Sequence, residues 1–124
     1  MVITGECFCG EVSYKIDGAV RDVVNCFCKQ CQKTSGHYVA ATRADKNDIA
    51  IIKDATLQWY ECLPNVFRGF CNQCGGSLFW DNKSAEDNGL AIMAGTLDAP
   101  TNLKTIGNIF TEDASDYCKI PSFE

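Results

Sequence analysis

The sequence has no long apolar run and no cluster of lysine and arginine. No segment approaches the roughly 18 consecutive apolar residues that a membrane span requires, so the sequence argues against a membrane protein. The formal net charge is −5, and affinity for nucleic acid depends largely on Lys and Arg contacts with phosphate. The sequence therefore argues against nucleic-acid binding and favours a small neutral or thiol-bearing partner.

An export signal is also missing from the first residues, MVITGECFCGEVSY, which lack both a basic region and an apolar region. We therefore expect the chain to be cytoplasmic, where disulfides rarely persist and clustered cysteines more often bind metal. The chain has nine cysteines, and this odd number also disfavours a framework of disulfides.

The length of 124 residues and the hydrophobic content of 46% are typical of one globular domain, which we expect to span residues 1–124. Short segments of alternating apolar residues, separated by turn residues, predict an all-β fold. Residues 82–89 are expected to form a loop, and residues 111–119 are the one place where a short helix is expected. The expected strands cover residues 11–16, 21–25, 37–43, 49–53, 56–62, 66–70, 77–80, 90–93 and 105–110.

Seven cysteines fall into three tight clusters. Cys7 and Cys9 are each part of CFCG, and Cys71 and Cys74 of CNQCGG, so both pairs are followed by glycine. A glycine there lets the chain turn sharply, so that backbone N–H groups can point at the thiolate sulfurs. Two such pairs supply the four ligands of a tetrahedral zinc ion, which predicts a structural zinc site that stabilises the fold.

The third cluster is CFCKQC, with Cys26, Cys28 and Cys31 on what is expected to be a loop. Three thiolates can bind one face of a zinc ion but leave its fourth ligand open, as water, a substrate thiol, Cys62 or Cys118. Water or a substrate thiol would make the zinc catalytic, since zinc lowers the pKa of a bound thiol. Cys62 or Cys118 as ligand would close the site. Neither has another cysteine at ligand spacing, so each could instead be a small half-buried thiol with no role in metal binding.

Four ordered motifs cover nearly the whole chain: TGECFCGEVSY, CFCKQCQKTSG, RGFCNQCGGSL and GTLDAP. Together they resemble the glutathione-dependent formaldehyde-activating enzyme family, which includes the centromere protein V group. The resemblance implies an all-β, Mss-four-like fold of bent antiparallel sheets around a structural zinc. It assigns the structural zinc to Cys7, Cys9, Cys71 and Cys74, and a catalytic zinc to Cys26, Cys28 and Cys31. Phe27 and Asn108 stand where the resemblance implies histidine.

The resemblance implies a carbon–sulfur lyase that condenses glutathione with formaldehyde to S-(hydroxymethyl)glutathione. The alternative is a non-catalytic zinc module of the same fold that binds a protein partner. His37, the sole histidine, could serve as a general base or be a solvated strand residue. Arg68 could bind a substrate carboxylate or be an ordinary surface residue. Large aromatic residues are expected in the core rather than in a binding site, namely Trp59, Phe79, Trp80 and Phe110.

Overall fold

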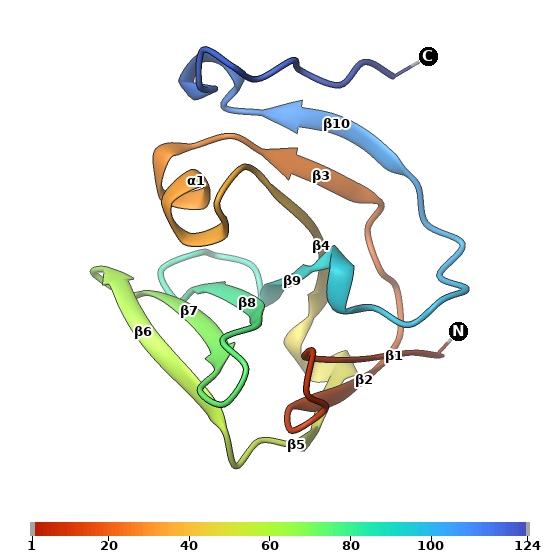
Figure 1. The fold of residues 1–124 in the computed structure, drawn as a ribbon. Coiled ribbons are helices and arrows are strands. Elements are labelled where there is room, and N and C mark those ends of the chain that lie inside the picture. The colour runs from red at the N-terminus through yellow and green to blue at the C-terminus, as the bar shows by residue number, and fades with distance from the viewer. Residues whose placement is uncertain (1, 124) are drawn as a thin grey trace.

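Two β-sheets and one short helix make up most of the computed structural model, which describes residues 2–123 (Figure 1). The expected all-β fold is confirmed. The small sheet has the order β1-β2-β5, and the large sheet has the order β10-β3-β4-β9-β8-β7-β6. The elements are β1 Val2–Glu6, β2 Ser13–Asp17, β3 Val23–Cys26, α1 Lys29–Ser35, β4 Val39–Asp45, β5 Ile49–Lys53, β6 Leu57–Leu63, β7 Val66–Cys71, β8 Ser77–Asn82, β9 Gly89–Met93 and β10 Thr105–Ile109.

The alternation of apolar residues along β2 corresponds to one buried face of the strand, as expected. Val12, Tyr14 and Ile16 are all buried, while Lys15 between them is exposed. They form one core with Leu78, Phe79 and Ile92 of the large sheet, and Cys7 and Cys71 belong to the same cluster. Apolar packing therefore holds the two sheets together, and Cys7 and Cys71 lie in the same packed region.

Strand pairing differs from the prediction in one place. All pairs are antiparallel except β10 with β3, which are parallel. The expected antiparallel sheets are present, with one parallel pair at this edge of the large sheet. A parallel neighbour requires a long connection, and the chain returns to β3 only after passing through β4 to β9. Alternation within single strands carries no signal for such a pairing.

The helix is also not where it was expected. Residues 29–35 form α1, whereas the stretch from residue 111 forms only the short 3₁₀ turn Thr111–Asp113. Cys28 is the N-cap of α1, and its Sγ accepts a hydrogen bond from the N–H of Cys31 at 3.3 Å. Gly36 ends the helix with a φ of 94°, a left-handed conformation that favours glycine. Within residues 2–123, no helix has the length and apolar character needed to cross a membrane.

Candidate metal centres

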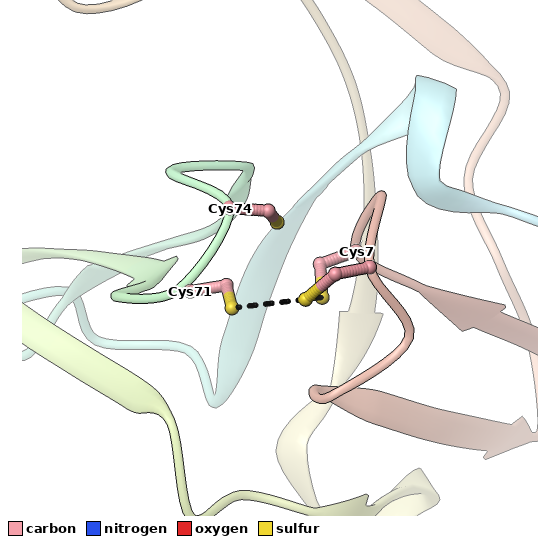
Figure 2. A group of neighbouring side chains, drawn as sticks. Cys7, Cys71 and Cys74 are labelled. Carbon is pink, nitrogen blue, oxygen red and sulfur yellow. Dashed lines mark hydrogen bonds between the residues drawn. The ribbon is translucent and has the colours of Figure 1, made fainter.

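Cys7, Cys9, Cys71 and Cys74 converge on one point, as the sequence predicted. Their Sγ atoms all lie within 4.8 Å of one another. Figure 2 shows the sulfurs of Cys7, Cys71 and Cys74 pointing toward each other from two loops that are far apart in the sequence. The distances from Cys9 Sγ to Cys7 Sγ and to Cys71 Sγ are both 3.7 Å. Four sulfurs bound to zinc at about 2.3 Å lie roughly 3.8 Å apart, so this set fits a tetrahedral zinc ion.

Each cysteine pair lies on a tight turn that ends in glycine. Gly10 follows Cys9 with a φ of 80°, and Gly75 follows Cys74 with a φ of 76°. In both turns a backbone N–H donates to a sulfur: Val12 to Cys7 Sγ at 3.3 Å, and Gln73 to Cys71 Sγ at 3.4 Å. The predicted resemblance between the two turns is therefore real at the level of backbone conformation.

The hydrogen bonds at this cluster favour thiolate at some positions and thiol at others. The hydroxyl of Thr56, 3.3 Å from Cys71 Sγ, is the main cause that lowers the pKa of Cys71 to about 6. At Cys9, a backbone hydrogen bond from Glu11 lowers the pKa. Burial and the neighbouring sulfurs outweigh it and raise the pKa to about 12. Four negative sulfurs at these distances repel one another, so a bound cation is what allows all four to be thiolates.

Removing the Thr56 hydroxyl is expected to weaken metal binding at this cluster without altering its four ligands. We expect Thr56→Val to lower zinc affinity about tenfold, because groups that hydrogen-bond to metal ligands typically contribute 10- to 100-fold. Competition with a chromophoric chelator measures the change. Thr4→Val is the matched control, since Thr4 donates to Asp98 and not to a sulfur. Equal zinc affinity in both variants would contradict the role given to Thr56.

The second cluster is built around the start of α1. Cys26 ends β3, Cys28 caps the helix and Cys31 lies in its first turn, so residues that were expected on a loop are fixed by a strand and a helix. Their three Sγ atoms lie within 4.8 Å of one another. No fourth His, Cys, Asp or Glu joins the group within residues 2–123. Three sulfurs are the donor set of a zinc site that shares its remaining position with a water or a substrate.

Hydrogen bonding within this cluster shifts the pKa values of Cys26 and Cys31 in opposite directions. The contact with the Cys31 thiol lowers the pKa of Cys26, and the same contact with Cys26 raises the pKa of Cys31. Arg68 on β7 also reaches the cluster, with its Nη2 3.7 Å from Cys31 Sγ. The guanidinium is therefore part of the surroundings of these sulfurs rather than an ordinary surface group. Sequence reasoning named Arg68 but could not place it beside Cys31.

A pocket of about 250 Å³ lies beside β7 and β8, and Arg68 is among the residues that line it. Arg68 and Thr34 line it on the side of Cys31, and Gly75 lines it next to Cys74. The remaining lining residues lie mainly on β7 and β8 and include Phe70, Ser77 and Phe79. Arg68 is the link between the pocket and the three-cysteine cluster, because it lines the pocket and contacts Cys31 Sγ.

Neither of the two remaining cysteines belongs to a cluster. Cys62 Sγ donates to the carbonyl of Val66 at 3.4 Å, on β6 and β7. Cys118 Sγ lies 4.0 Å from Nε2 of His37, which is exposed after α1 and before β4. The structure thus does not support Cys62 or Cys118 as the fourth ligand of the second cluster. His37 is not in a strand, and it contacts Tyr38 and Tyr117 instead of the clustered sulfurs.

Phe27 and Asn108, which replace the implied histidines, both have structural roles. Phe27 is buried and stacks on Tyr38 at a centroid distance of 4.7 Å. Asn108 accepts a hydrogen bond from Asn25 at 3.2 Å and donates to the carbonyl of Pro121 at 2.8 Å. These side chains fix β3, β10 and the C-terminal segment, so neither position offers a proton-transfer group.

The C-terminal segment is fastened directly to α1 by Gln32. The amide of Gln32 donates to the carbonyl of Phe27 at 2.6 Å and to that of Asp113 at 2.7 Å. Ser115 Oγ donates to Gln32 Oε1 at 2.6 Å. The helix that carries Cys31 is therefore held on one side by residues more than 80 positions further along the chain.

The prediction that the large aromatic residues belong to the core holds only in part. Phe79 is buried, and Trp80 is half-buried and donates from Nε1 to Gln30 Oε1 at 3.2 Å. Trp59 is 38% exposed and stacks over Phe79 at 5.9 Å, next to Gly69. Phe110 is 51% exposed. The position of a residue in a strand does not reveal which face of the sheet is covered. β6 is an edge strand, and most of its residues are exposed.

Comparison with known proteins agrees with this geometry. The family described as "Glutathione-dependent formaldehyde-activating enzyme" matches residues 2–113. The chain belongs to this family. The matched residues include both cysteine clusters and all the residues that line the pocket.

Among solved structures, this family member is similar to a crystal structure of a Rhodobacter sphaeroides protein that was a structural-genomics target. The TM-score is 0.67 at 21% sequence identity, and the alignment covers 85% of this chain and 98% of the other. This likeness shows that the two proteins share a fold. A search of curated proteins found no match.

Proposed function

We propose that the protein is a zinc-dependent enzyme of carbon–sulfur bond formation and cleavage that acts on a small thiol adduct, by default glutathione with formaldehyde. Membership of the family supports the reaction class. The observation that carries the proposal is the cluster of Cys26, Cys28 and Cys31, which supplies three sulfurs next to a pocket of about 250 Å³. Three protein ligands are typical of catalytic zinc, whereas four are typical of structural zinc.

In the proposed reaction the thiol sulfur bonds to the carbonyl carbon of formaldehyde, and the thiol proton ends on the oxygen, giving S-(hydroxymethyl)glutathione. Zinc, when bound, lowers the pKa of a coordinated thiol and so supplies thiolate near neutral pH. Cys26, Cys28 and Cys31 would hold this ion. Cys7, Cys9, Cys71 and Cys74 would hold a second zinc that supports the fold. The pocket would orient the substrate, and Arg68 would face it beside Cys31.

Thiol titration of the cobalt-substituted protein tests the proposal. We expect glutathione to change the thiolate-to-cobalt charge-transfer band, because its sulfur would join the three cysteine sulfurs as a ligand. S-methylglutathione is the matched control, since it lacks the free thiol, and it is expected to leave the band unchanged. No response to glutathione or to any other small thiol would overturn the enzyme proposal and favour the zinc module that binds a protein partner.

A further inference from the structure

Arg68 is the one cationic side chain that joins the pocket to the three-cysteine cluster among the described residues that line it. It lies on β7 and is half-buried. Its Nη2 donates to Gln30 Oε1 at 2.6 Å and lies 3.7 Å from Cys31 Sγ, and its Nε donates to the same Gln30 oxygen at 3.1 Å. A group that binds to the rest of this guanidinium therefore lies close to the proposed metal ligands.

No carboxylate neutralises Arg68 within residues 2–123. The ion pairs of this part of the chain are Arg43 with Asp87 and Lys46 with Asp81, and neither involves Arg68. A guanidinium has five N–H donors, and a neutral amide oxygen uses only some of them. A half-buried guanidinium that lines a pocket and has no carboxylate partner is well suited to bind a carboxylate of a ligand.

Gln30 fixes the orientation of this guanidinium. Its Oε1 accepts from both Arg68 nitrogens and also from Trp80 Nε1 at 3.2 Å. Gln30 is on α1 and Trp80 is on β8, so two elements hold one acceptor in place. A planar guanidinium that is already oriented loses less conformational entropy when its remaining N–H groups bind a carboxylate.

We propose that the pocket selects thiols that carry a carboxylate, and that Arg68 is the positioning residue that binds this carboxylate next to Cys31. The proposal rests on the proposed function and narrows its substrate class. The pocket, at about 250 Å³, lies below the roughly 300–1,000 Å³ of typical small-molecule sites, which favours a compact ligand. A small mercapto acid contains the minimum chemistry, and glutathione, with its own carboxylates, belongs to the same class.

Calorimetric titration of the zinc-loaded protein with 3-mercaptopropionate and with its neutral amide, 3-mercaptopropionamide, tests the proposal. The wild-type protein is expected to bind the acid about tenfold more tightly or better, as charge-assisted hydrogen bonds would produce. In Arg68→Gln this preference should fall to about threefold or less, while the affinity for the amide stays the same. Arg68→Lys should keep part of the preference, because it retains the charge but not the fork of donors.

Comparing the ratio of the two affinities between variants removes intrinsic differences between the two thiols. Arg43→Gln is the matched control: Arg43 pairs with Asp87 away from the pocket, and its loss should leave the ratio unchanged. If both thiols bind to the wild type equally well, or if Arg68→Gln weakens both equally, the carboxylate proposal fails and the proposed function stands. If neither thiol binds to the wild type, the carboxylate proposal fails, and the glutathione titration of the cobalt-substituted protein decides the proposed function separately.

Discussion

Replacing Cys71 with serine is expected to abolish the stable fold. Cys71 is buried, and its sulfur belongs both to the four-cysteine cluster and to the hydrophobic core. Structural zinc in small domains contributes an apparent binding free energy of about 10–16 kcal/mol, which is comparable to the whole stability of about 5–15 kcal/mol of an ordinary domain. Thermal unfolding followed by circular dichroism should therefore show no cooperative transition, or one lowered by tens of degrees.

Cys62→Ser provides the control for this result. Cys62 is a half-buried cysteine on the neighbouring strand β6, but its sulfur bonds only to the Val66 carbonyl. We expect this variant to unfold within a few degrees of the wild type. A Cys71→Ser protein that unfolds as cooperatively and at the same temperature as Cys62→Ser would contradict a stabilising zinc at the four-cysteine cluster.

The corresponding change in the second cluster, Cys28→Ser, is expected to abolish thiol binding while leaving the fold largely intact. It removes one of three sulfurs, so the metal content should fall from two zinc ions per chain to one, and thiol binding should be lost. The fold should remain, because serine is itself a good N-cap and preserves the start of α1. Zinc measured per chain by atomic emission, together with the thermal unfolding curve, separates the two effects.

Cys118→Ser is the control here, since Cys118 contacts His37 but lies outside the cluster. It should keep two zinc ions and bind thiols as the wild type does. If Cys28→Ser instead lowers stability as much as Cys71→Ser, the division between a structural and a catalytic zinc is wrong.

The features that the sequence predicted correctly are those set by local spacing. The two glycine-terminated cysteine turns could be recognised because a left-handed residue directly after each pair is needed to aim N–H groups at sulfur, and Gly10 and Gly75 supply it. The buried face of β2 was equally local, since every second side chain of a strand points the same way. Such signals need only a few neighbouring residues.

The features that were missed depend on contacts between distant segments. Helix α1 has seven residues and buries only Cys31, so it has no apolar periodicity, although Gly36 was a usable stop signal. β1, Val2–Glu6, was not predicted, and its Gly5 weakens the strand pattern. The Gly5 position is too crowded for any Cβ because the ring of Tyr14 lies directly against it, a fact visible only in three dimensions. Arg68 likewise acquires its significance only from the approach of β7 to α1.

The hydrogen bonds of Gln32 make the helix that carries Cys31 depend on the C-terminal segment. The family match ends at residue 113, but Ser115, just beyond it, hydrogen-bonds to the side chain of Gln32. Gln32 directly follows Cys31 in α1. Substitutions in the C-terminal segment can therefore change the orientation of Cys28 and Cys31 without replacing either cysteine. A substitution at Ser115 is therefore expected to affect the centre from outside the matched region.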